Sequence, residues 1–232
     1  FEFCQSLITE ISFPESVKII ASNAFHSSAI KGNLALPHNL ESIGSAAFCE
    51  CYGLTGSLVI PDKVEIISSS AFSFCGFTGT LTLPKGLVEI GNEAFRCTEF
   101  KGELNIPSSV VTIGSSAFSF TLFNGTLVLP SELLSLGSQV FYYCGRLSGV
   151  VEIPENIVSI PFGLFDGCTG LEGIKLHKDV EVIESQAFYN CSSLTSINIP
   201  SSVTSIGNQA FSGCTSLANI DIPSSVTSIG TQ

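Results

Sequence analysis

The chain has 232 residues, of which 44% are hydrophobic and 12% charged, and its formal net charge is −11 at pH 7. Its nine lysines and arginines are scattered singly. This argues against nucleic acid or an anionic membrane surface as a partner, because clustered basic residues bind both. The uninterrupted apolar runs are only a few residues long, so we expect no direct membrane insertion by this part of the chain.

A proline recurs every 23 or 24 residues, and His177 stands in the one slot that lacks it. A fixed period of this size is typical of a solenoid, in which each unit is too short to bury its own apolar residues and packs against its neighbours. We therefore predict a single repeat array over residues 1–232. Phe1 and Gln232 both fall inside a repeat, so we expect a fragment of a longer protein. The prolines are Pro14, Pro37, Pro61, Pro84, Pro107, Pro130, Pro154, Pro200 and Pro223.

A short strand is predicted directly before each proline. Leu81 and Leu83, for example, lie three places and one place before Pro84. Apolar residues two positions apart indicate a strand with one buried face. The proline ends this strand, because it has no N–H to donate to a neighbouring strand.

After the proline, apolar residues recur at the third and sixth places, as Val110 and Ile113 do after Pro107. This spacing predicts a turn or a short second extended segment. A glycine often comes next, and we expect it to supply a positive φ. These glycines are Gly44, Gly91, Gly114, Gly137, Gly207 and Gly230.

An Ala-Phe pair, such as Ala117-Phe118, follows in most repeats. Stacked coils would place these rings in one column, a phenylalanine spine along the axis of the array. The small residue before each ring keeps the segment close to the core, and we expect a single helical or 3₁₀ turn here. The spine consists of Phe1, Phe25, Phe48, Phe72, Phe95, Phe118, Phe141, Phe165, Phe188 and Phe211.

Seven of the nine cysteines stand three places after a spine phenylalanine, where other coils have Ser28, Thr98 or Thr121. A position that accepts Cys, Ser or Thr is small and semi-polar, which favours buried free thiols. Stacking would also bring some of these cysteines close enough to form disulfides, so bridging stays an alternative and the redox compartment stays open. The seven are Cys4, Cys51, Cys75, Cys144, Cys168, Cys191 and Cys214.

The return segment toward the next strand comes in two forms. Six coils carry an apolar residue, a spacer and a glycine, as in Leu54-Thr55-Gly56, whereas the last three coils lack the glycine. We expect this difference to change the curvature or twist of the array near residue 165.

Residues 194–214 follow the pattern L-x-x-I-x-I-P-x-x-V-x-x-I-G-x-x-A-F-x-x-C, which resembles the BspA-type leucine-rich repeat. The resemblance covers the whole chain and recurs about ten times. It implies an α/β-type repeat solenoid, right-handed, with a parallel sheet of about ten short strands and short turns or 3₁₀/helical turns on the other side. It also implies a surface or secreted, adhesin-like protein with no shared catalytic residues.

Leucine-rich repeats generally bind partners through the concave face of this sheet, formed by residues that alternate with the buried strand positions. Here that face is small, polar and nearly uncharged, with an apolar stretch at Val128 and Val150. A solvated sheet face that binds nothing is the alternative. The candidate partner-binding residues are Thr80, Thr82, Glu103, Asn105, Thr126, Val128, Val150, Glu152, Lys175 and Asn198.

Four aromatic residues, Phe3, Phe74, Phe120 and Tyr143, stand one place before the cysteine position. Exposed, they would form an adhesive edge, but packing between coils is the favoured interpretation.

We expect no catalytic residue, no cofactor and no metal site. The three histidines His26, His38 and His177 occupy different repeat positions, and Cys49-Glu50-Cys51 has no second pair at zinc spacing.

The sequence thus predicts a non-enzymatic interaction or adhesion module, extracellular or at the cell surface, that binds protein or glycan. The alternatives are a cytoplasmic interaction scaffold, and a repeat domain attached to a catalytic domain outside this fragment.

Overall fold

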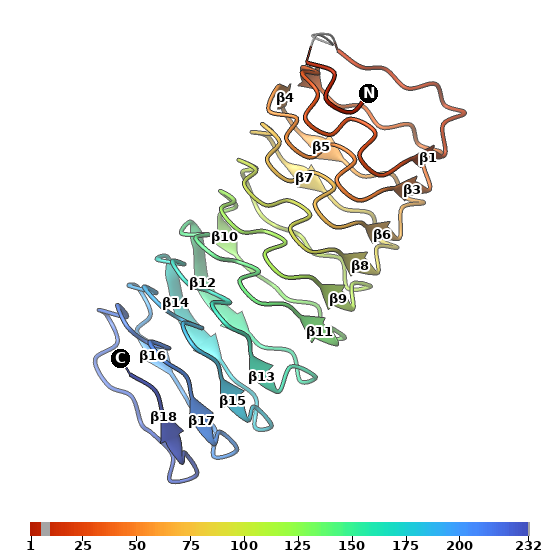
Figure 1. Cartoon of the computed structure of the whole chain (residues 1–232). Helices are drawn as coiled ribbons and strands as arrows, with labels where there is room; N and C mark the ends of the chain where they lie inside the picture. The colour runs from red at the N-terminus through yellow and green to blue at the C-terminus, as the bar shows by residue number, and fades with distance from the viewer. Residues whose placement is uncertain (6–9, 232) are drawn as a thin grey trace.

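A computed structural model describes residues 1–5 and 10–231. The chain forms a parallel β-solenoid whose coils are stacked from the N-terminal end, red in Figure 1, to the C-terminal end, blue. All pairings between the described strands are parallel, and each joins residues about one repeat apart. The predicted parallel solenoid is confirmed.

The second extended segment, at the sixth place after the proline, forms the more continuous of two columns of strands. We call it the post-proline column. It makes a sheet of six strands, ordered β1-β3-β6-β8-β9-β11, and a sheet of four, ordered β13-β15-β17-β18. Its strands are β1 (Ile19–Ile20), β3 (Ser42–Ile43), β6 (Ile66–Ile67), β8 (Glu89–Ile90), β9 (Thr112–Ile113), β11 (Ser135–Leu136), β13 (Ser159–Ile160), β15 (Val182–Ile183), β17 (Ser205–Ile206) and β18 (Ser228–Ile229).

The strands before the prolines form the other column, the pre-proline column, which is broken into the sheets β2-β4, β5-β7 and β10-β12-β14-β16. The expected single sheet of about ten strands is therefore replaced by two columns. A proline without an N–H follows the pre-proline segment in most coils, and several of these segments contain or adjoin a glycine with positive φ, so few residues per coil stay extended. These strands are β2 (Gly32–Asn33), β4 (Leu54–Thr55), β5 (Leu58–Val59), β7 (Leu81–Thr82), β10 (Gly125–Thr126), β12 (Leu147–Glu152), β14 (Leu171–Lys175) and β16 (Ser196–Ile197).

The Ala-Phe segment is a series of turns, and the expected helical or 3₁₀ turn is not confirmed anywhere in the described residues. Two residues per segment, Asn23 and Ser27 in the first complete coil, have a positive φ of 58° and 50°. Phe25 donates its N–H to Ala47 of the next coil at 2.8 Å, whereas Ala24 donates to Ala21 of its own coil at 3.2 Å. Bonding to the next coil replaces the uniform internal bonding that a helix requires.

The phenylalanine spine is confirmed. Successive rings stack with centroids 5.2–6.1 Å apart along the whole array. A second, shorter column of Phe77, Phe100 and Phe123 meets the spine edge to face, as Phe123 does against Phe118 at 6.1 Å. The second column and the spine from Phe25 to Phe188 are buried in the core, whereas Phe211 packs against it and Phe1 is exposed.

The six glycines that follow the sixth place after the proline are needed because the backbone of the preceding coil lies close to them. The positive φ expected for these glycines is wrong. None of the six is among the glycines with positive φ. A Cβ on Gly114 would lie 2.5 Å from the backbone nitrogen of Asn92 and 2.7 Å from the carbonyl carbon of Gly91 in the preceding coil. The two backbones therefore approach too closely at this point for a side chain to fit without a shift.

All nine cysteines are free thiols, and six of the seven in the predicted column are buried. Each buried thiol donates a hydrogen bond to a main-chain carbonyl of the preceding coil, as Cys144 does to Phe118 at 3.0 Å. Burial raises the pKa of Cys144 to about 11. A donated hydrogen bond and a raised pKa both describe an inert structural thiol.

Candidate functional site

The ten candidate partner-binding residues are all exposed on one face, which we call the pre-proline face. Val128 is 70% exposed and Val150 is 41% exposed. Lys175 on β14 pairs with Glu152 on β12, one coil away. The stacking therefore aligns these side chains in rows, while their role in binding remains a prediction.

Two open hollows lie where the pre-proline strands meet their prolines. One, of about 470 Å³, is lined by apolar residues such as Leu34, Val59 and Ile60. The other, of about 430 Å³, is lined by Glu132, Glu152 and Glu155 among others. The second hollow disfavours an anionic ligand, because several carboxylates face the same space.

The aromatic column at Phe3, Phe74, Phe120 and Tyr143 is more exposed than expected. Phe3, Phe120 and Tyr143 are 61%, 40% and 48% exposed, so the favoured packing between coils is wrong for them. All four residues have a φ near +56°, which turns their side chains away from the core. Phe120 and Tyr143 stack on each other at 5.5 Å, and Tyr142 packs edge-on against Phe120 at 5.1 Å.

We call Phe120, Tyr142 and Tyr143 the aromatic edge. The Tyr143 ring lies over Gly167 of the next coil, where an added Cβ would come within 2.9 Å of the ring. This edge therefore presents aromatic rings to solvent beside the backbone of Gly167.

An apolar stripe on the post-proline column was not predicted from the sequence. The fourth place after the proline holds Val88, Val111, Leu134 and Val158 in four successive coils, and all but the partly buried Val111 are exposed. Glu65 and Glu181 stand in this position on either side of the stripe. An apolar residue at this place in successive repeats is a signal that the sequence alone contains.

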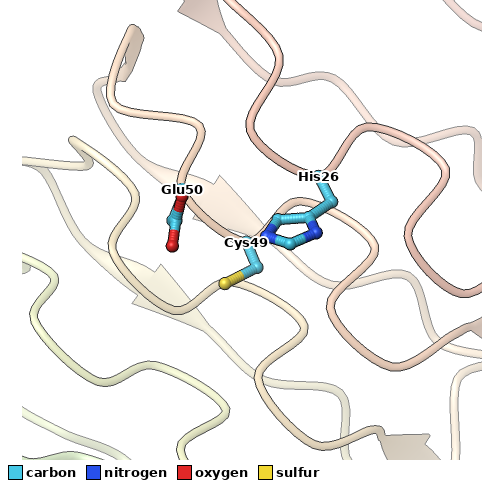
Figure 2. Close-up of side chains that lie close together, drawn as sticks. All are labelled: His26, Cys49 and Glu50. Atoms are coloured by element: carbon cyan, nitrogen blue, oxygen red, sulfur yellow. The ribbon is translucent and has the colours of Figure 1, made fainter. Parts of the chain in front are cut away.

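His26, Cys49 and Glu50 form a cluster that their sequence positions do not indicate. Their potential ligand atoms all lie within 4.8 Å of one another, and the three side chains converge in Figure 2. His26 belongs to the coil before that of Cys49, and 23 residues separate the two. No other coil has a histidine at this repeat position, so the sequence pattern alone does not indicate that stacking places His26 beside a cysteine.

The repeat pattern and the fold agree with comparisons with known proteins. The BspA type leucine rich repeat region matches residues 1–123, 31–148 and 134–232. The chain belongs to the BspA-type leucine-rich repeat family. It is similar to a leucine-rich repeat protein from Bacteroides ovatus ATCC 8483, with 30% identity and a TM-score of 0.69 over 99% of this chain and 70% of that one.

A second similar structure is the leucine-rich repeat protein of T. pallidum, with 22% identity and a TM-score of 0.52 over 92% of this chain and 89% of that one. Among curated proteins, none matches this sequence significantly. The described part of this BspA-type array has no helix with the length and apolar character needed to cross a bilayer.

One coil of the BspA-type array buries a carboxyl group. Asp166 follows spine residue Phe165, is only 5% exposed, and its Oδ1 atom has no hydrogen-bond partner among the residues that the structure describes. Burial raises the pKa of Asp166 to about 6. The same coil has Pro161 in place of the usual glycine, and the post-proline column is interrupted between β11 and β13 just before it.

Proposed function

We propose that this chain is a non-enzymatic interaction module of a cell-surface or secreted protein, and that it binds protein or glycan through the pre-proline face. The observation that carries the proposal is the alignment of ten exposed, mostly small and polar side chains across successive coils. Such a surface suits an extended ligand, since each coil offers similar groups at a regular spacing.

The apolar patch at Val128 and Val150 is the proposed centre of the binding surface. Val128 stands two places before Pro130 and Val150 four places before Pro154 in the next coil, and both are exposed. The ion pair between Glu152 and Lys175 borders this patch. An apolar centre with a polar surround is the usual organisation of a protein-binding surface.

The surface location is supported by membership in the BspA-type family, because this repeat resembles that of surface and secreted adhesins. The acidic surface, with a net charge of −11, would keep so apolar an array soluble. The alternatives are a cytoplasmic interaction scaffold and a repeat domain attached to a catalytic domain. A secretion signal or surface anchor encoded in the same gene would favour the surface protein over both.

The double variant Val128→Lys with Val150→Lys should weaken binding to a genuine partner at least about tenfold, because two charges would replace the apolar centre of the surface. Partners are first identified with the unmodified protein on arrays of host-matrix proteins and of glycans. The affinity for each hit is then measured by surface plasmon resonance for both proteins.

The matched control is Val88→Lys with Val158→Lys, which places the same charges on valines that are 40% and 43% exposed on the apolar stripe. The proposal requires that this control bind normally. Equal binding by both double variants would exclude the pre-proline face. A loss of binding only in Phe120→Ala with Tyr143→Ala would assign the ligand to the aromatic edge.

A further inference from the structure

The cluster of His26, Cys49 and Glu50 combines three chemically different ligands at one place. An imidazole nitrogen, a thiol sulfur and a carboxylate oxygen lie within 4.8 Å of one another. Mg²⁺ and Ca²⁺ prefer sites built only of oxygen, whereas zinc is bound by nitrogen, sulfur and oxygen together. The donor set therefore selects a borderline transition metal.

Two of the three ligands, His26 and Glu50, have a partner that orients them. The Nδ1 atom of His26 faces the Glu2 carboxylate at 3.7 Å, which leaves Nε2 for a metal. The Phe3 ring packs against the imidazole at 5.3 Å. Ser27 donates its hydroxyl to Oε2 of Glu50 at 2.6 Å. A carboxylate behind a histidine and a donor behind a carboxylate are the usual outer partners of metal ligands.

The main chain holds the two coils in register at this point. Ser27 donates its N–H to the carbonyl of Cys49 at 2.8 Å, and Phe3 donates its N–H to the carbonyl of His26 at 2.8 Å. The donor atoms of a tetrahedral zinc site lie about 3.5 Å apart, given bonds of about 2.0–2.3 Å. Side-chain rotations that move the ligand atoms by about 1 Å would therefore close the cluster around an ion, with no change in the stacking of the coils.

The local charge favours a cation. The Glu2 carboxylate lies beside His26, and the Glu50 carboxylate lies in the cluster itself. A divalent cation would offset the repulsion between a thiolate and these carboxylates. The cluster is open to the surface, because Glu50 and Ser27 line a hollow of about 380 Å³.

We propose that Nε2 of His26, Sγ of Cys49 and a carboxylate oxygen of Glu50 bind one zinc ion, with water as the fourth ligand. Binding replaces the Cys49 S–H bond with an S–Zn bond and releases one proton to solvent, with no change in oxidation state. An ion held in this way would connect two neighbouring coils at the N-terminal end of the array.

Titration of the metal-free protein with Co²⁺ tests the site, because a cobalt–thiolate bond produces a charge-transfer band in the near ultraviolet. We expect this band to saturate at one Co²⁺ per chain and to disappear when one equivalent of Zn²⁺ is added. The number of protons released, measured in a weak buffer, should approach one per ion.

Cys49→Ser should abolish the band, and His26→Gln should weaken Co²⁺ binding at least tenfold. Glu2→Gln, which removes only the partner of Nδ1, should weaken it about 10–100-fold. The matched control is Cys97→Ser, which removes another half-buried thiol and should bind as the unmodified protein does.

Circular dichroism shows whether each variant is folded, and His26→Gln tests the proposal even if Cys49→Ser fails to fold. Absence of the band in the unmodified protein would overturn the proposal. Equal loss of the band in Cys49→Ser and Cys97→Ser, or normal binding by His26→Gln, would also overturn it, because the metal would then be held by other thiols.

Discussion

Replacement of Phe118 by alanine should reduce the free energy of unfolding by about 3–5 kcal/mol, the usual cost of removing a buried aromatic ring. Phe118 is fully buried and stacks between Phe95 at 5.6 Å and Phe141 at 5.9 Å. It also meets Phe123 edge to face at 6.1 Å. The ring thus links three coils, and its loss would leave a cavity in the middle of the spine. Urea denaturation followed by circular dichroism measures the change.

Phe120→Ala is the matched control, because it removes the same side chain from the same coil. Phe120 is 40% exposed, and its φ of 58° directs the ring away from the core. We expect this variant to lose less than about 1 kcal/mol, since most of the transfer free energy is never gained by an exposed ring. Similar losses in Phe118→Ala and Phe120→Ala would show that the spine is not the core of the array.

Replacement of Gly114 by alanine should reduce the free energy of unfolding by about 1–3 kcal/mol, the usual cost of overpacking. The new Cβ would lie 2.5 Å from the backbone nitrogen of Asn92, so two stacked coils would have to separate locally. Other coils accommodate a side chain at this position, as Ser68 does by donating to the carbonyl of Ile43 at 2.7 Å. For this reason we expect destabilisation without complete unfolding, measured by the same urea transition.

Gly86→Ala is the control for this prediction. Gly86 also lacks a positive φ, and the nearest atom to an added Cβ is the carbonyl oxygen of Asp62 at 3.9 Å. Alanine there restricts the unfolded chain without crowding the folded one, so the stability should be unchanged or slightly increased. A loss in Gly86→Ala as large as that in Gly114→Ala would mean that glycine is required for its flexibility and not for close approach.

The features that repeat in every coil could be predicted from the sequence. The period indicates the solenoid, and the alignment of Phe118 with its equivalents predicts the spine, because equivalent positions must meet when coils stack in register. The free thiols also follow from a position that accepts Cys144 in one coil and Thr121 in another. In each case the same physical requirement is repeated, so one coil explains the others.

Features that depend on backbone angles or on neighbouring coils could not be predicted. Phe120 and Tyr143 were expected to pack because aromatic rings usually do, and the positive φ that exposes them is not encoded by residue type. A positive φ is the expected reason for Gly114, because a single repeat does not show how closely Asn92 of the preceding coil approaches. The proximity of His26 and Cys49 is hidden for the same reason. They stand at equivalent places in successive coils, and no other pair of coils repeats this combination.

Thiol labelling of the folded protein tests most directly whether the coils are stacked in register. The unmodified chain is treated with iodoacetamide in the presence of a metal chelator, and the modified positions are identified by mass spectrometry over time. Stacking predicts that Cys75, Cys144 and Cys168, which are buried in the column, stay unmodified long after the half-buried Cys4 and Cys97 have reacted. Modification of those three buried thiols at the rate observed in urea would contradict the stacked solenoid.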